Sequence, residues 1–250
     1  MMIIVFSPRE AFTPTSFPSQ FMNIMRKHER QPPPMKFSDE HINWRDEDGN
    51  TILHYAAWTG NIYLARNLFD SAKGKTLIGI ANNKGATAFA LAIIATQDKM
   101  VEEFFMNKTA KKCIDFEATL HESKESIAHL LLQYAPFVHP KFLLKRKDLT
   151  KEILNKIDAE GNTPLLHVAS RNNMHTVRHI LTSKAVKDGH MLDLGIKNNQ
   201  GRTLLHYLVE NRDEENFRCL LDREELTADV ANIPDKEGKT PMFYCLTKGA

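Results

Sequence analysis

The stretch Asp-Glu-Asp-Gly-Asn-Thr-Ile-Leu-His at residues 46–54 returns, with changes, along the chain. Close copies stand at 158–167 and 198–206, and weaker ones at 82–90 and 235–243. All of them share the frame Asp/Asn-x-x-Gly-x-Thr. A chain that repeats itself is built of stacked units, so its function is expected on an extended surface and not in a single pocket.

The spacing of the copies gives the size of the unit. Successive frame glycines lie 36, 76, 40 and 37 residues apart, at Gly49, Gly85, Gly161, Gly201 and Gly238. The interval of 76 is close to two units, so one copy in the middle has lost its motif. Each intact copy combines a polar turn, a glycine free to adopt positive φ, a threonine suited to capping and an apolar stretch. This pattern predicts a turn followed by two short helices.

Residues 46–69 carry the most specific form of the pattern. Thr51 to Ala57 reads Thr-Ile-Leu-His-Tyr-Ala-Ala, and Gly60-Asn61 precedes the apolar stretch 64–69. The chain here resembles the ankyrin-repeat family, whose unit of about 33 residues has a Thr-Pro-Leu-His-x-Ala core. The resemblance implies an all-α ankyrin-repeat solenoid, in which Gly-Asn ends a first helix and a second helix buries an apolar face against the next unit.

Two copies depart from the family pattern at its histidine. The copy at 82–90 has Ala90 there. The copy at 158–167 has Leu166 there, with His167 one step further and about 100° around the helix. The usual hydrogen bond of the family histidine to the backbone is therefore in doubt at His167.

The region 107–157 lacks the motif. We interpret Ser126 to Ala135 as the second helix of a degenerate unit, with Cys113 to His121 as a first helix that no glycine turn introduces. Residues 141–157 are interpreted as an irregular helical insertion. The sequence leaves open whether 107–157 stacks as a repeat or stands aside from the array.

The resulting organisation is a leader or cap at 1–43, repeats 1 and 2 at 44–106, the degenerate region at 107–157, and further repeats at 158–250. Thr240 to Gly249 aligns with Thr51 to Gly60 and so represents a first helix without its partner. Such a helix leaves an apolar face exposed, which terminal repeats normally avoid by capping. We therefore expect the chain to belong to a longer protein.

The composition of the chain limits the classes of function that it can have. A formal net charge of +2 favours neither a nucleic-acid binder nor a membrane protein. The apolar run at 1–6 is too short, and lacks the basic residues, to be a signal peptide. Cys113, Cys219 and Cys245 are widely separated, which indicates reduced thiols and a cytoplasmic location.

Motifs for chemistry are sparse. His175 and His179 have a spacing that could hold zinc with a third ligand, but two polar helical positions explain them better. No nucleophile elbow, phosphate loop or HExxH pattern occurs, so we expect no catalytic residue, no cofactor and no metal. A basic segment at 141–151, with apolar residues interleaved, raises the alternative of lipid or nucleic-acid contact, although a solvated helix face explains it more simply.

The family resemblance implies a non-catalytic module that binds a partner protein along a concave face made of hairpin tips and first helices. No small-molecule substrate is expected. The style of the repeats is similar to ankyrin proteins that bacteria deliver into host cytosol, so the alternative is a targeting region with a catalytic domain beyond residue 250. The candidate contact residues are Asp46, Glu47, Asn50, Tyr55, Trp58, Lys84, Glu160, Asn162, Arg171, Gln200, Arg202 and Tyr207.

Overall fold

The computed structural model describes residues 36–134, 139–145, 149–188, 191–221 and 223–247. Within these ranges the regular secondary structure is helical, and β structure is limited to isolated bridges at Ala81–Thr87 and Thr119–Ser126. The chain divides into two compact units, Met1–Asp115 and Phe116–Ala250. The prediction of an all-α fold made of repeated helix pairs is confirmed.

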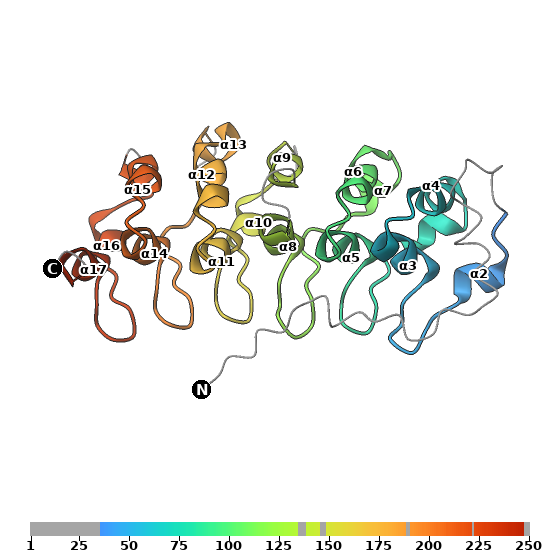
Figure 1. Ribbon diagram of the computed structural model, residues 1–250, viewed down its shortest axis with the longest axis horizontal. Coiled ribbons are helices and arrows are strands. Elements are labelled where there is room, and N and C mark those ends of the chain that lie inside the picture. Colours follow the sequence, from blue (N-terminus) through green and yellow to red (C-terminus); the bar gives the residue numbers. More distant parts are fainter. Residues whose placement is uncertain (1–35, 135–138, 146–148, 189–190, 222, 248–250) are drawn as a thin grey trace. The chain divides into compact units, whose positions relative to one another are not determined.

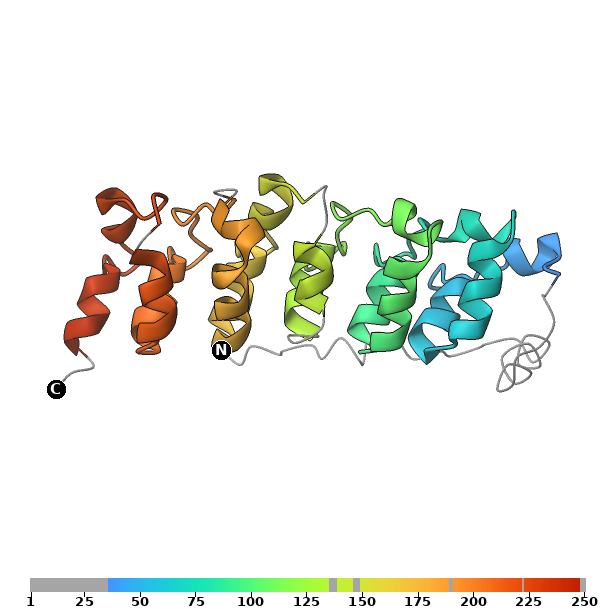
Figure 2. The same ribbon diagram turned by 90° about the horizontal axis from the view of Figure 1, so that it is seen from above.

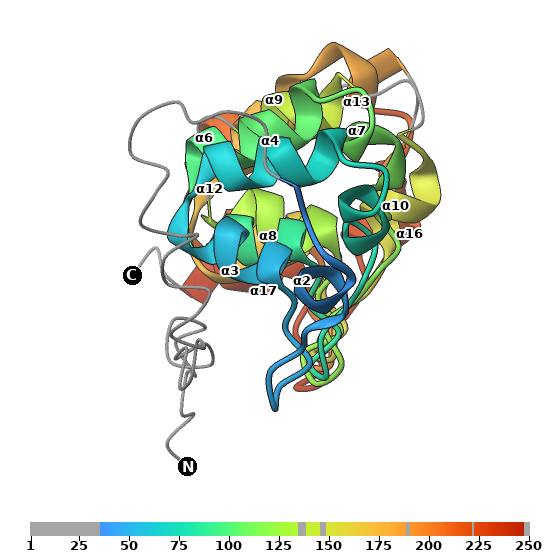
Figure 3. The same cartoon turned by 90° about the vertical axis from the view of Figure 1, so that its right-hand side faces the viewer.

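The first unit contains two repeats, which follow the short helix α2. Each repeat has a first helix, a second helix packed on it, and a short helical turn (Figure 3). Phe69 and Phe104, on consecutive second helices, place their ring centroids 4.9 Å apart in the buried core. The elements are α2 (Asp39–Asn43), α3 (Ile52–Thr59), α4 (Ile62–Asp70), η1 (Gly74–Leu77), α5 (Ala88–Ile94), α6 (Asp98–Met106) and α7 (Ala110–Cys113).

The second unit continues the same plan. Its first helices α8, α11, α14 and α17 pack side by side, and its second helices α9, α12 and α15 form another row, which lies above the first in Figure 1 (Figures 1 and 2). The elements are α8 (Ile127–Tyr134), α9 (His139–Leu144), α10 (Lys151–Asn155), α11 (Pro164–Ser170), α12 (Met174–Thr182), α13 (Lys184–Asp188), α14 (Leu204–Glu210), α15 (Glu214–Leu221), α16 (Ala228–Ala231) and α17 (Pro241–Thr247).

The turn and cap residues act as the sequence predicted. Thr51 accepts hydrogen bonds from the backbone amides of Leu53 and His54 at the start of α3. Gly60 ends that helix with φ of 71°, and Asn61 caps the next one. Later repeats reach the same left-handed conformation at this position without glycine, at Thr96, Asn172 and Arg212. The backbone path is therefore set by the repeat and not by glycine alone.

The interpretation of residues 126–135 as a second helix is wrong. α8 is a first helix, because it packs against α11, and Ser126 and His129 stand where Thr51 and His54 stand in repeat 1. The preceding loop has lost its glycine, and Lys124 takes the positive φ of 54° in its place. From Leu120 to Glu125 this loop is one residue longer than the loop from Asp46 to Asn50.

The second helix of this repeat is α9, which overlaps the start of the segment predicted to be an insertion. The short helix α10 follows α9. Each of the remaining second helices, α4, α6, α12 and α15, is also followed by a short helix, namely η1, α7, α13 and α16. A helical segment that each repeat contains explains why these units exceed the 33 residues of the family consensus. With Ser126 included, the capping residues are spaced by 36, 39, 37, 40 and 37 residues, and the register is unbroken.

Candidate interaction surface

Neighbouring hairpin loops of the second unit are joined by hydrogen bonds. The amide of Ala159 donates to Ser123 O at 2.8 Å, that of Asn199 to Glu160 O at 2.8 Å, and that of Lys236 to Gln200 O at 3.0 Å. In the first unit, Asn83 donates in the same way to Asp48 O at 2.9 Å. Because each loop is tied to the next, the side chains at the tips are held in rows, one group per repeat.

A second bond ties the loops of several repeats to their own first helices. Tyr55 donates its hydroxyl hydrogen to Asp46 Oδ2 at 2.8 Å, and Tyr244 lies 2.5 Å from Asp235 Oδ2 in the same relationship. In each case the two residues are nine positions apart. His167 and Asp158 have the same separation and make the equivalent contact. His167 therefore stands where repeats 1, 5 and 6 have a tyrosine, and Leu166 occupies the position of the family histidine.

The histidines at the family position connect consecutive repeats. His54 Nδ1 accepts from the Thr51 amide at 3.1 Å, which leaves the Nε2 hydrogen to be donated to Ala86 O, 2.9 Å away in the next loop. His129 and His206 repeat this arrangement towards Asn162 O and Lys239 O. Burial lowers the pKa of His54 and of His129 to about 4, outweighing the hydrogen bond to the carbonyl. These rings are neutral structural links, which agrees with the structural role that their place in the repeat indicates.

His167 has a more polar environment. Its Nε2 lies 2.8 Å from Gln133 Oε1 and 3.4 Å from Glu125 Oε1, and its side chain is 2% exposed. Burial tends to raise the pKa of Asp158, but the hydrogen bonds from His167 and the Asn162 amide outweigh it, so the pKa is lowered. A buried network of this kind stabilises the joint between repeats 3 and 4 only while each member keeps its partner.

The predicted contact residues divide by exposure. Four of them are buried and belong to the internal framework, so their side chains are not on the surface: Asn50, Tyr55, Asn162 and Tyr207. Asp46, Trp58 and Arg202 are half-buried. The exposed ones are Glu47, Lys84, Glu160, Arg171 and Gln200. Lys236 and Glu237, in the last loop, are exposed in the corresponding positions.

Arg202 is held by its own repeat and the next. Its guanidinium donates to Glu210 Oε2 at 2.6 Å and to the Tyr244 hydroxyl at 2.9 Å, and lies over the Tyr244 ring. Burial works to lower the pKa of Arg202, but these bonds raise it, so the group stays charged. Arg202 therefore acts first as a link between α14 and α17.

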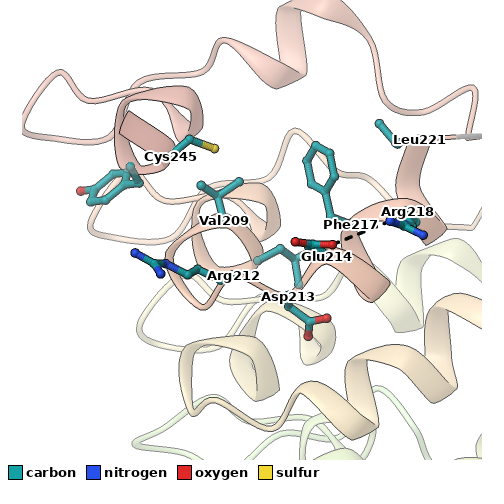
Figure 4. Close-up of a pocket in the computed structure, with 10 residues that line it drawn as sticks. Val209, Arg212, Asp213, Glu214, Phe217, Arg218, Leu221 and Cys245 are labelled. Atoms are coloured by element: carbon teal, nitrogen blue, oxygen red, sulfur yellow. Dashed lines mark ion pairs between the residues drawn. The ribbon is translucent and has the colours of Figure 1, made fainter. Parts of the chain in front are cut away.

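None of the contact residues predicted from the sequence lines the groove between α15 and α17. Phe217 and Leu221 of α15 line it from one side and Cys245 of α17 from the other, over a floor that includes Val209 (Figure 4). The cavity measures about 390 Å³. Leu221 is 57% exposed and Met242, on α17, is 62% exposed.

The described residues contain no cluster of three or more His, Cys, Asp or Glu side chains that could hold a metal ion. None of the helices resolved here has both the length and the apolar character to cross a membrane. In the basic segment, Lys145 is exposed and Leu143 is buried, while residues 146–148 lie outside the described residues.

Comparison with known proteins agrees with this architecture. Residues 107–228 match the family model for ankyrin repeats in three copies, and residues 48–80 match the model for a single ankyrin repeat. An ankyrin repeat domain from Acinetobacter baumannii superposes with a TM-score of 0.59 at 21% identity, covering 79% of this chain and 91% of that one. A chain from a complex of a predatory endopeptidase of Bdellovibrio bacteriovorus with an immunity protein gives 0.55 at 22% identity, covering 81% and 91%.

Proposed function

This chain belongs to the ankyrin-repeat family, and we propose that it is a non-catalytic module that binds a partner protein through its hairpin tips and first helices. Ankyrin repeats indicate a protein partner. The observation that carries the proposal is the row of exposed tip side chains in the second unit, one group per loop, on loops that are hydrogen-bonded to one another.

A row held in this way suits recognition of a folded surface. Ordering of mobile loops opposes binding, and loops already fixed by their neighbours avoid most of that cost. Glu160, Gln200 and Lys236 come from three successive loops, and Arg171 lies at the end of α11. Because both signs of charge and an amide alternate along the row, the surface favours a polar partner of mixed charge over a nucleic acid or an anionic membrane.

The proposal is tested by capture of partners from lysate with two matched variants. Glu160→Lys combined with Arg171→Glu reverses two exposed charges on the proposed surface without altering the net charge. Lys184→Glu combined with Asp188→Lys does the same on α13, where the side chains are 91% and 64% exposed. Loss of a captured protein with the first variant and its retention with the second supports the proposal, whereas equal retention by both contradicts it. Tyr55→Ala is unsuitable, because Tyr55 is 3% exposed and its loss perturbs the fold.

A targeting role within a longer protein is the second candidate. The exposed face of α15 and α17 supports it, because apolar stacking positions are normally covered. Expression of the complete gene product and limited proteolysis would reveal whether a further folded domain accompanies the array. The free cysteines at 113, 219 and 245 support a reducing, cytoplasmic setting as part of the same proposal.

A further inference from the structure

The hairpin loop of repeat 3 differs from the other loops at its tip. Lys124 lies there with φ of 54°, where five other loops have a glycine with φ between 76° and 79°. A side chain disfavours this left-handed conformation, because its Cβ crowds the backbone. Lys124 is exposed and forms no ion pair with any described residue. Its side chain is therefore available to another molecule.

The loop of repeat 4 carries a matching change. A Cβ at Gly161 would lie 2.9 Å from Asn199 Oδ1, so this asparagine covers the glycine of the preceding loop. The glycine of repeat 1 has the same contact with an asparagine, at 2.7 Å. The residue in that position beside Lys124 is Ala159, which is identified by the hydrogen bond from its amide to Ser123 O. Because alanine has no Oδ1, it leaves room for the Cβ of Lys124.

The exchange also removes a hydrogen bond between the loops. Asn199 Nδ2 donates to Ala159 O at 3.0 Å, and the equivalent asparagine of repeat 2 donates to the loop of repeat 1 at the same distance. Ala159 has no side-chain donor, so this bond is missing between repeats 3 and 4. Strained backbone conformations are concentrated at functional sites, so the departure at Lys124 favours a contact with another molecule.

The charges around Lys124 define the chemistry of that contact. Glu122 is exposed in the same loop, and Glu160 is exposed in the next loop. Glu125 is buried, with its carboxylate 3.4 Å from His167 Nε2, and so belongs to the interior. Lys124 is thus a single cation beside two exposed carboxylates. A complementary surface places a carboxylate between basic side chains, whereas the phosphates of a nucleic acid would also meet both glutamates.

We propose that Lys124 determines specificity within the row of hairpin tips by pairing with a carboxylate of the partner protein. Basic side chains beside that carboxylate meet Glu122 and Glu160. The inference rests on the proposed function, and it adds the chemistry that the partner presents to repeats 3 and 4.

A carbodiimide cross-linker tests the contact, because it joins a lysine amine to a carboxylate only where the two groups touch. The 250-residue protein is mixed with lysate and the cross-linker, and the linked peptides are identified by mass spectrometry. We expect Lys124 to be joined to an aspartate or glutamate of the protein that the combined Glu160→Lys and Arg171→Glu variant fails to capture. Links from Lys124 only to Glu122 or Glu160 of its own chain overturn the inference.

Substitutions then measure the contribution of the charge. Lys124→Gly, which relieves the disfavoured backbone conformation, and Lys124→Gln are each expected to weaken binding of the identified protein by about fivefold. Lys124→Arg keeps the charge, so its affinity should stay within about twofold of the original. Lys184→Gln, on α13, is the control that leaves affinity unchanged.

The outcomes separate this inference from the proposed function. Circular dichroism first establishes that each variant is folded. Binding that the combined Glu160→Lys and Arg171→Glu variant abolishes, but that Lys124→Gly and Lys124→Gln leave unchanged, overturns the inference alone. If no captured protein depends on either set of substitutions, the proposed function fails and the inference fails with it.

Discussion

The imidazole Nδ1 of His167 lies 2.7 Å from Asp158 Oδ2, in the position where Tyr55 and Tyr244 donate to the first aspartate of their own loops. The displaced histidine of repeat 4 thus keeps the loop attached to its helix by a different donor. Since Glu125 and Gln133 face the other side of its ring, the same residue also joins repeat 3 to repeat 4.

Replacement of His167 by leucine should destabilise the second unit by about 2–4 kcal/mol, because it leaves the buried Asp158 and Glu125 without this partner. Urea unfolding followed by circular dichroism measures the effect. In a double-mutant cycle with Asp158→Asn, we expect coupling of about 1 kcal/mol or more. Strict additivity of the two changes would show that the contact contributes nothing.

Stability should fall as the pH drops from 6.5 towards 4. His54 and His129 have a folded pKa of about 4 and an unfolded pKa near 6.5, so the unfolded chain binds more protons in this window. Each histidine accounts for a loss of roughly 2–3 kcal/mol between pH 7 and pH 4.5. His129→Leu copies the residue found at this position in repeat 4, Leu166, and should reduce the loss measured by urea unfolding at the two pH values. An unchanged pH dependence would contradict the assignment.

Alanine substitutions at two glycines with the same backbone conformation distinguish the cost of backbone strain from the cost of a steric clash with the neighbouring loop. Gly201 and Gly238 both have φ of 76°, but a Cβ at Gly201 would lie 2.7 Å from Lys236 N, whereas one at Gly238 would meet nothing within 4 Å. Gly238→Ala should cost about 1–2 kcal/mol, from the backbone alone. Gly201→Ala should cost more, because the neighbouring loop must shift. Equal costs in thermal unfolding would mean that loop contact is unimportant.

Lys124→Gly should stabilise the protein by up to about 1 kcal/mol. Lys124 has φ of 54°, which a side chain disfavours, and glycine is the residue of five other loops at this point. The gain is limited by the greater entropy of glycine in the unfolded chain. A rise in the melting temperature supports this view, while a fall would indicate that the lysine side chain stabilises the loop.

Much of the fold was predictable because its determinants are local. Glycine, threonine and the histidine three residues later specify a turn, a cap and a link to the next loop, and the sequence displays all three. The turn and first helix of repeat 3 were not recognised from the sequence. In this repeat Lys124 and Ser126 occupy the positions of the glycine and the threonine, in a loop that is one residue longer. The spacing Ser126-x-x-His129 was the available signal. The short third helices have no motif, so only the excess length of each unit pointed to them.

The surface was less predictable, since exposure depends on neighbours distant in sequence. Asn50 and Asn162 are polar residues in turns, yet the loop of the next repeat buries them through Asn82 and Asn198. Tyr55 and Tyr207 are buried because their hydroxyl groups bond to residues of their own loops, Asp46 and Asn198. The groove beside Leu221 was not predicted, because only the packing brings together its lining residues from α14, α15 and α17.

The most direct test of the interaction surface is amide hydrogen exchange of the protein with and without the first partner captured by its hairpin face. We predict slower exchange on binding in the loops around residues 159–160, 199–200 and 235–237 and at the end of α11, with the back of α12 and α13 unchanged. Protection confined to the second-helix row, with the loops exchanging as in the free protein, would contradict the central claim.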